Sequence, residues 1–189
     1  MNLDGKSDSQ SFAQTGDKQA LFETLFLPHL DAAYNLARWM VQRDQDAHDV
    51  VQEAYIRALK GFAGFHGGNA RAWLLTIVRN TARTWLRQQS RFANIVPFDE
   101  SVHALPVVDP ASESFQEGRI EQLHTALTKL PVEFREVLLL YEIEGWSYKQ
   151  IASALALPVG TVMSRLNRAR RRLQREIAFA QDEEVQNGL

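Results

Sequence analysis

The chain has 189 residues, a formal net charge of −2, 45% hydrophobic residues and no cysteine. This length accommodates one medium domain or two small ones, and the lack of cysteine excludes disulfides, thiolate metal sites and a cysteine nucleophile. No apolar run approaches the roughly 20 residues that span a bilayer, and the polar N-terminus lacks the pattern of a signal peptide, so we expect a cytoplasmic protein whose residues 1–19 form a disordered tail.

The first half of the chain predicts a helical domain over residues 20–92. Hydrophobic residues recur at three- and four-residue spacing over residues 22–37, 46–60 and 70–90, and no alternating strand pattern occurs. Between the second and third of these helices, residues 61–69 form a loop rich in glycine and aromatic residues.

The character of the sequence changes after this domain. Residues 93–118 contain three prolines and five acidic residues, which interrupt any helix and predict a linker. Helical patterns return over residues 119–178, and residues 179–189 are expected to form a tail. The predicted fold class is therefore all-α, with two small helical domains joined by a flexible linker.

A helix-turn-helix is predicted in the second domain. Ser147 and Gln150 have the spacing of a capping box that starts a helix over residues 148–155. A short break at residues 156–157 follows, and Pro158 suits the first turn of the next helix. Two short helices around such a turn are typical of a DNA-binding unit.

The second helix of this unit has two different faces. At 100° per residue, one narrow stripe is apolar and should face the core: Val162, Leu166, Ala169 and Leu173. The opposite face and its flanks are polar and basic: Gly160, Thr161, Ser164, Arg165, Asn167, Arg168 and Arg171. Arginine, asparagine and serine can hydrogen-bond to base edges or phosphates. The alternative is a helix-packing unit without a DNA role.

Basic residues are concentrated in two windows. Residues 54–98 and 145–175 each contain seven of the 21 basic residues and none of the 23 acidic ones. Two basic surfaces on an otherwise acidic chain indicate two contacts with a polyanion, most plausibly nucleic acid. Two solvated helix faces are the alternative.

The first basic window places polar residues opposite the expected core of its helix: Thr76, Arg79, Asn80, Arg83 and Arg87. Trp73 lies at the side of this face, and Phe65 lies in the loop before it. Arginines beside aromatic rings suit single-stranded DNA, whose bases stack on such rings. Alternatively, the aromatic residues belong to the core. Because cysteine is absent and the histidines are scattered, we expect no metal site and no cofactor.

These motifs resemble those of the extracytoplasmic-function (ECF) sigma factors, compact members of the bacterial sigma family, over residues 21–92 and 119–177. The resemblance of residues 46–55 implies that three residues bind core RNA polymerase, at the coiled coil of its β′ subunit: Asp49, Gln52 and Glu53. Residues 72–87 are similar to the segment that melts and reads the −10 promoter element. Asn80 and the preceding loop would there hold a flipped base.

The closest resemblance covers residues 130–170, which are similar to the reader of the −35 promoter element. One departure is visible: Thr84 stands where the family usually has an acidic residue, which leaves the base preference of that helix open.

The resemblance implies a non-enzymatic initiation factor for a stress- or signal-responsive set of genes. Its expected partners are core RNA polymerase (β′ coiled coil and β flap), promoter DNA and, as in many relatives, an anti-sigma factor, without membrane insertion. The acidic linker would thread toward the RNA exit channel or act as a plain spacer.

Two other functional classes make different demands on the sequence. A stand-alone helix-turn-helix regulator predicts a dimer on palindromic sites, but no dimerisation heptad is present. An enzyme acting on nucleic acid needs clustered carboxylates or a nucleophile with its base, and the basic windows contain no acid.

Overall fold

The computed structural model describes residues 18–41, 43–93 and 115–187, and within these ranges every regular element is a helix. The predicted all-α class is thus confirmed. Most of the predicted tail (residues 1–17) and most of the predicted linker (residues 94–114) lie outside the described residues. None of the described helices is both long and apolar enough to cross a bilayer.

The first domain is built from a helical segment over residues 18–26 and five named elements. These are η1 (Leu27–His29), α2 (Leu30–Met40), α3 (Asp44–Gly61), η2 (Phe62–Gly64) and α4 (Ala70–Ala93). The helix expected over residues 22–37 is divided at η1, which contains Pro28. Proline has no amide hydrogen to donate and its ring crowds the preceding turn. Helices α2, α3 and α4 pack against one another and bury the predicted apolar faces.

The second domain contains α5 (Phe115–Thr128), α6 (Val132–Glu142), α7 (Tyr148–Leu155) and α8 (Val159–Asn187). Helix α8 continues nine residues beyond the predicted boundary at residue 178, so the expected tail is helical as far as Asn187. Residues 178–187 contain no glycine or proline and are rich in alanine, glutamine and glutamate, all good helix formers.

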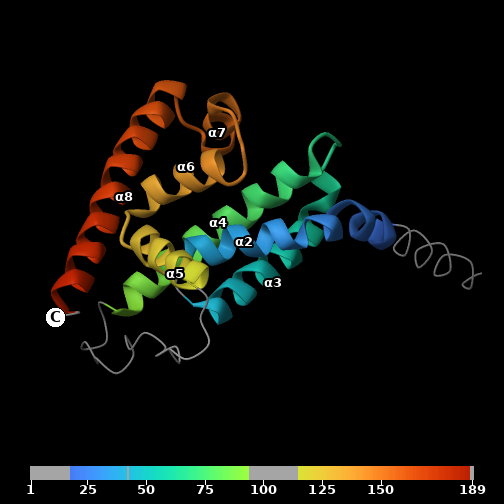
Figure 1. The fold of residues 1–189 in the computed structure, drawn as a ribbon. Coiled ribbons are helices and arrows are strands. Elements are labelled where there is room, and N and C mark those ends of the chain that lie inside the picture. The colour runs from blue at the N-terminus through green and yellow to red at the C-terminus, as the bar shows by residue number, and fades with distance from the viewer. Residues whose placement is uncertain (1–17, 42, 94–114, 188–189) are drawn as a thin grey trace, which may run out of the picture.

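The two domains pack directly against each other. Helix α2 of the first domain lies against α5 and α6 of the second, as Figure 1 shows. One cluster of buried hydrophobic residues runs through both domains, from Phe22 to Ala169. The sequence predicted two domains on a tether and gave no indication of this contact, which covers part of a predicted functional surface.

Candidate nucleic-acid interface

The helix-turn-helix has the caps that its sequence predicts. The Gln150 amide donates to Ser147 Oγ at 3.3 Å, and the Ser147 amide donates to Gln150 Oε1 at 2.8 Å, which completes the capping box. At the other end of α7, Ala156 adopts a left-handed conformation with φ of 51°, and its amide donates to the carbonyls of Ala152 and Ser153. The Pro158 carbonyl then accepts from the amides of the first turn of α8. The turn between α7 and α8 is thus closed by local hydrogen bonds.

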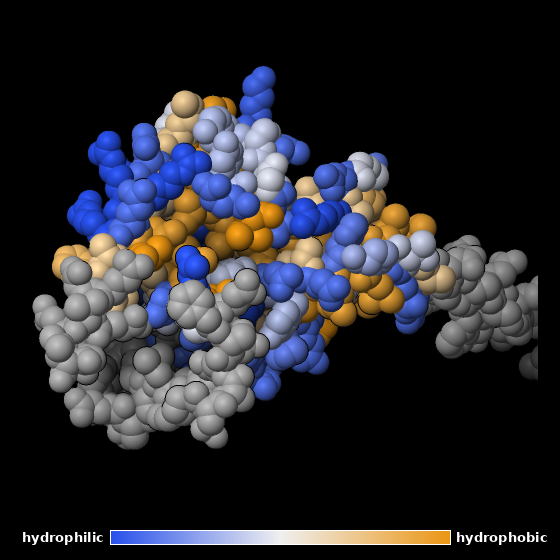
Figure 2. Space-filling view, in the orientation of Figure 1, coloured by the Kyte–Doolittle hydropathy of each residue, from blue (hydrophilic) through white to orange (hydrophobic). Residues whose placement is uncertain are grey.

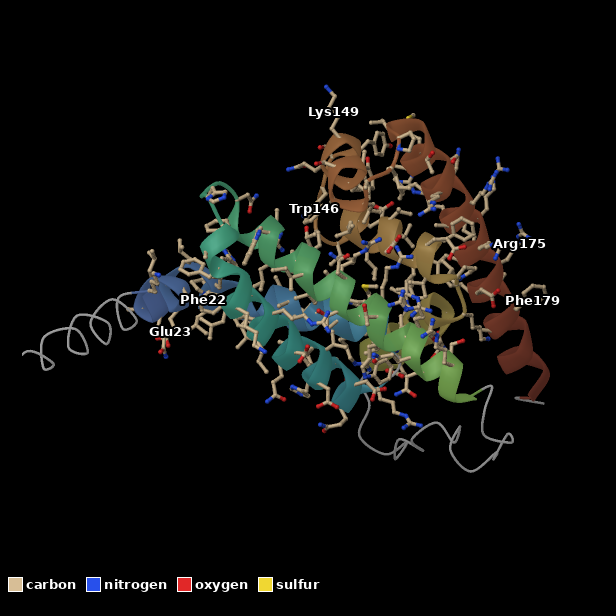
Figure 3. The ribbon with its side chains drawn as sticks, turned by 180° about the vertical axis from the view of Figure 1, so that it is seen from behind. Phe22, Glu23, Trp146, Lys149, Arg175 and Phe179 are labelled. Atoms are coloured by element: carbon tan, nitrogen blue, oxygen red, sulfur yellow. The ribbon has the colours of Figure 1, made fainter. Side chains whose placement is uncertain are left out.

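Helix α8 has the two faces expected from its sequence. Val162, Leu166 and Ala169 are fully or almost fully buried, and Leu173 is half-buried. The opposite face is exposed at five of the predicted DNA-binding residues: Gly160, Ser164, Asn167, Arg168 and Arg171. Thr161 and Arg165 are half-buried at its edges. In Figure 2, hydrophilic side chains gather along α8, and in Figure 3 Arg175 points outward from it.

Two other arginines of this helix are held within the second domain. Arg170 donates to Glu142 Oε1 at 2.7 and 3.0 Å and lies 5.3 Å from the ring centroid of Tyr141. Arg172 lies 5.1 Å from the ring centroid of Phe134. These contacts hold α8 against α6. The arginines of α8 therefore form two groups, those that pack against α6 and those that face outward.

The predicted DNA-binding face of α4 is partly covered by the second domain. Asn80, Arg83 and Arg87 are exposed and Thr76 is half-buried. Arg79, expected to face solvent, is only 6% exposed. Arg79 does point away from the core of the first domain, as the helical projection of α4 predicts. It is buried because α6 of the second domain lies over this turn of α4.

A cleft of about 560 Å³ remains between α4 and the start of α6. Its walls include four of the predicted −10 residues together with Thr84: Arg79, Asn80, Arg83, Thr84 and Arg87. The Thr84 hydroxyl donates to the Asn80 carbonyl at 3.0 Å. The Thr84 side chain therefore hydrogen-bonds within α4, whereas a longer acidic side chain at this position would reach into the cleft.

The predicted stacking residues Phe65 and Trp73 belong to an aromatic cluster. Their ring centroids lie 5.4 and 5.1 Å from that of Phe26, which is completely buried, and 5.2 Å from each other. Phe22 and Phe62 complete the cluster. Phe65 and Trp73 remain half-buried. Of the two readings of these aromatics, the packing favours a core role that also fixes the loop before α4.

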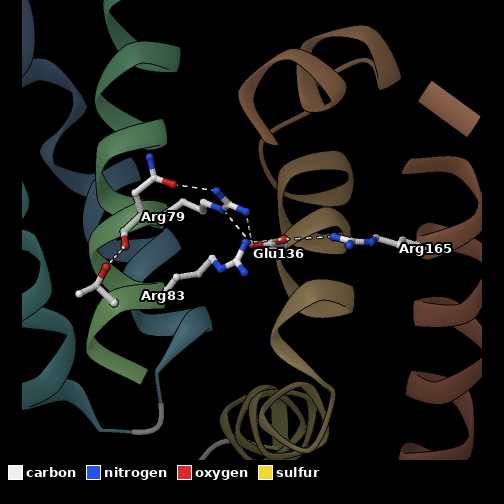
Figure 4. A network of polar contacts seen from close by, with 6 residues as sticks. Arg79, Arg83, Glu136 and Arg165 are labelled. Carbon is white, nitrogen blue, oxygen red and sulfur yellow. Dashed lines mark hydrogen bonds and ion pairs between the residues drawn. The ribbon is translucent and has the colours of Figure 1, made fainter. Parts of the chain in front are cut away.

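A buried carboxylate joins the two predicted DNA-binding helices, as Figure 4 shows. Glu136 of α6 has no exposed side-chain surface; its Oε2 accepts from Arg79 Nε at 2.8 Å and lies 2.5 Å from Arg79 Nη2. Arg83 Nη1 approaches the same oxygen at 3.5 Å, and Arg165 Nη1 of α8 lies 3.6 Å from Oε1. We call these four residues the Glu136 cluster. Burial lowers the pKa of Arg79, and the charge of Glu136 opposes that shift.

Sequence reasoning did not find Glu136. It lies beside the run Val137–Leu140 of α6, all of which is buried. A charged residue on such a hydrophobic helix needs a partner of opposite charge. This pattern is the one feature of the sequence that could have indicated a buried ion pair at Glu136. The identity of the partner depends on the contact between domains, which no local pattern contains.

Further polar contacts between the domains involve residues that the sequence did not single out. Arg71 Nη2 of α4 forms an ion pair at 2.6 Å with Glu144, whose side chain is 2% exposed. Burial raises the pKa of Glu144, and Arg71 opposes the rise. His124 Nε2 lies 2.7 Å from the Arg38 carbonyl and 3.0 Å from the Val41 carbonyl, at the end of α2.

The predicted polymerase-binding residues lie together on the outside of the first domain. Asp49, Gln52 and Glu53 are exposed on successive turns of α3. Glu53 accepts from Arg57 at 2.8 Å within the same helix. The three polar side chains thus form one accessible face, away from the buried residues of α3.

Both domains match known family models. The model described as Sigma-70 region 2 matches residues 25–92, and the one described as Sigma-70, region 4 matches residues 120–173. The first contains α3 and most of α4, and the second contains the helix-turn-helix.

Similar proteins cover most of the chain. The RNA polymerase sigma-H factor of Pseudomonas aeruginosa is 35% identical over 173 residues, which are 87% of this chain and 89% of that protein. The ECF RNA polymerase sigma-E factor of Escherichia coli K12 is 32% identical over 173 residues, 87% of this chain and 90% of that one.

Two solved structures resemble the present one. The sigma factor RpoE in complex with the anti-sigma factor NepR, from Bartonella quintana, has a TM-score of 0.67 and 27% identity and covers 83% of this chain and 96% of that chain. CnrH in complex with the cytosolic domain of CnrY has a TM-score of 0.60 and 28% identity, with 86% and 91% covered.

Proposed function

The chain belongs to the ECF sigma factors of the sigma-70 family and directs promoter-specific transcription by RNA polymerase, and from this premise we propose which of its surfaces perform each step. The stand-alone helix-turn-helix regulator is not favoured, because both domains match sigma-70 regions. We take residues 20–92 and 119–178 as the two functional domains, the second extended by the end of α8. The linker between them, residues 93–118, lies mostly outside the described residues.

We propose that α8 binds the −35 element. The observation that carries this assignment is its exposed face, where Ser164 and Asn167 lie near the helix N-terminus and Arg168 and Arg171 lie farther along. In helix-turn-helix proteins the N-terminal part of the second helix contacts base edges in the major groove. Arginines beyond it contact phosphates and position the helix.

We propose that α4 and the preceding loop bind the −10 element as single-stranded DNA. Asn80, Arg83 and Arg87 supply hydrogen-bond donors and charge, and Arg79 joins them once it is uncovered. Phe65 and Trp73 pack against Phe26 but are only half-buried, so part of each side chain is accessible for stacking with a base.

We propose that the α3 face formed by Asp49, Gln52 and Glu53 binds the β′ coiled coil of core polymerase, and that the second domain contacts the β flap. The chain then acts in the cytoplasm by binding and needs no catalytic residue or cofactor of its own. Both similar sigma structures were solved with a protein partner, one of them named as an anti-sigma factor. We therefore propose that this chain also accepts an anti-sigma factor.

Reconstitution with core polymerase tests this assignment. The full chain is expected to co-elute with core enzyme in size-exclusion chromatography and to support transcription from a library of genomic promoter fragments. The double variant Asp49→Ala, Glu53→Ala is expected to lose co-elution. The matched control is Glu23→Gln, an exposed acidic residue outside α3. Absence of any association with polymerase would overturn the assignment, and binding to palindromic DNA without polymerase would favour the stand-alone regulator.

A further inference from the structure

The cleft between α4 and the start of α6 has more positive charge around it than negative. Three arginines of α4 line it, and no carboxylate of the described residues does: Arg79, Arg83 and Arg87. Glu136 pairs with the first two, and Arg165 adds another positive charge from the opposite side of Glu136 (Figure 4). Arg87 has no ion-pair partner within the part of the chain that the structure describes. This surplus of positive charge attracts an anion to the cleft.

The protonation equilibrium of Arg79 reflects the surplus. Burial lowers the pKa of Arg79, Glu136 opposes the shift, and the charges of Arg83 and Arg165 reinforce it. One carboxylate thus compensates three guanidinium groups at a place where solvent is partly excluded. Phosphate oxygens would supply further negative charge, because arginine binds them through charge-assisted hydrogen bonds.

The neutral side chain at position 84 leaves this charge in place. Thr84 lines the cleft, and its hydroxyl donates to the Asn80 carbonyl within α4. The acidic residue expected at this position would have added a carboxylate beside the arginines. Ser90, one further polar residue of the lining, is also neutral. Both hydroxyl groups are suited to hydrogen bonding with a polar ligand.

The cleft has the size and the mixed lining of a small-molecule site. Its volume of about 560 Å³ lies within the range of roughly 300–1,000 Å³ that is typical of ligand pockets. Leu86 and Val132, both half-buried, supply apolar surface beside the arginines. Val132 is the first residue of α6, so the positive end of that helix dipole also lies at the cleft. An inorganic anion would use the charged part of the lining and leave the apolar part without contact.

We propose that this cleft binds a nucleoside di- or triphosphate. The phosphates contact Arg83 and Arg87, both exposed, and the nucleoside lies against Leu86 and Val132. Both helices form the site, and its occupant is a small molecule, so the proposal goes beyond promoter binding by α4. A nucleotide bound there stabilises the folded chain, as does any ligand that binds only the folded form.

Isothermal titration calorimetry on the full chain, without DNA or polymerase, tests the proposal. The probes are ATP, GTP, pyrophosphate and adenosine, at about 0.15 M salt so that attraction to exposed surface charges is screened. At least one of the two nucleotides should bind roughly tenfold more tightly than pyrophosphate, because its base and ribose bury apolar surface. Adenosine, which has no phosphate, should not bind measurably. The nucleotide that binds should also raise the thermal denaturation midpoint.

Two pairs of variants locate the nucleotide. Ser90→Glu on α4 and Val132→Glu on α6 each add a negative charge to one wall of the cleft, and each should raise the Kd roughly tenfold or more. Ser90→Gln and Val132→Gln are the matched controls of nearly equal size, and they should retain most of the wild-type affinity. Arg171→Ala removes an exposed arginine of α8 outside the cleft and should leave the Kd unchanged.

Both charged variants are compatible with their helices. Glutamate is a better helix former than serine, and a negative charge is favourable in the first turn of a helix. Circular dichroism checks the fold of each variant. If Val132→Glu does not fold, hydrogen exchange of the wild type replaces it, because a nucleotide in the cleft should slow amide exchange at the start of α6 as well as on α4.

Several results would overturn the proposal. One is the absence of measurable binding by either nucleotide, and another is binding of pyrophosphate as tight as that of both nucleotides. Equal losses in Arg171→Ala and Ser90→Glu would show unspecific attraction to arginines. A loss in Ser90→Glu without one in Val132→Glu would place the nucleotide on the α4 surface alone, as expected if it only mimics promoter DNA. Because the test contains no DNA or polymerase, its outcome is independent of the assignment of the −10 element to α4.

Discussion

Arg135 of α6 donates a hydrogen bond to the backbone carbonyl of Met40, the last residue of α2, across the boundary between the two domains. The same guanidinium donates to the carbonyls of Thr128 and Leu130, where α5 ends. The Met40 and Thr128 carbonyls belong to helix termini, which lack partners within their own helices, and the Leu130 carbonyl lies in the turn between α5 and α6. Burial lowers the pKa of Arg135 to about 10. One side chain thus caps helix ends from both domains.

Replacement of Arg135 by methionine should destabilise the protein by roughly 2–4 kcal/mol. The substitution keeps most of the apolar stem but leaves buried carbonyls without donors, each of which costs about 1–3 kcal/mol before relaxation. Urea denaturation followed by circular dichroism measures the loss. Arg168→Met, at an exposed position of α8, is the control and should change stability by less than about 0.5 kcal/mol. A loss of similar size in both variants would contradict the capping role.

Acidification should weaken the contact between α2 and α5 through His124. Burial, reinforced by the charge of Arg38, lowers the pKa of His124 below its usual 6.5, although hydrogen bonds to the Arg38 and Val41 carbonyls and the charge of Glu121 oppose this. Since the unfolded chain takes up this proton first, the contribution of the neutral ring is present above pH 6.5 and is lost as pH falls through the folded-state pKa.

Denaturation midpoints at a series of pH values below 6.5 test this behaviour. The wild type should lose stability more steeply with falling pH than His124→Gln. The control His48→Gln, at an exposed position of α3, should follow the wild type. Parallel pH profiles for all three proteins would mean that His124 is not responsible.

Glycine in place of Ala156 should leave stability unchanged or raise it by about 0.5–1 kcal/mol. Ala156 has φ of 51° at the end of α7, and a left-handed conformation costs an L-residue with a Cβ roughly 1–2 kcal/mol. Glycine avoids this cost but loses more chain entropy on folding. The same change at Ala154, inside α7, should instead destabilise by about 1 kcal/mol. Thermal melts of both variants make the comparison, and equal losses would show that the turn is not strained.

Two substitutions on α8 should have distinguishable effects on promoter binding by the polymerase complex. Asn167→Ala should reduce discrimination at one base pair of the −35 element by roughly 1–3 kcal/mol. Arg171→Ala should weaken binding to all sequences alike and lower the slope of log affinity against log salt by about one. Salt titrations on a set of −35 variants measure both quantities. Gln174→Ala, also exposed on α8, is the control, and a loss equal to that of Arg171→Ala would contradict a specific phosphate contact.

The helix-turn-helix was predictable almost residue by residue because its determinants are local. The capping box at Ser147 and the apolar stripe beginning at Val162 depend on neighbours a few positions away, and both are as expected. The burial of Arg79 was not predictable in this way. It depends on Glu136, which is 57 residues distant in the sequence.

The same distinction explains the other departures. Phe65 and Trp73 were predicted beside the polar face of α4 as DNA-stacking residues, but they meet Phe26 only when the N-terminal helical segment packs against α4. Residues 179–187 were assigned to a tail, beyond the predicted apolar stripe that ends at Leu173. Helix propensity alone, however, supports the continuation of α8.

The Glu136 cluster contains three arginines and one glutamate, so it carries a formal surplus of two positive charges. Because like charges are crowded here, substitution of an arginine, as well as of the glutamate, would change the strength of the contact between the domains. Loss of the charge at Arg165, the most distant of the three at 3.6 Å, would relieve repulsion and strengthen the contact between the two domains, whereas loss of the charge of Glu136 would weaken it. The strength of this contact between the domains is thus set by the charges at four positions, and single substitutions at any of them can raise or lower it.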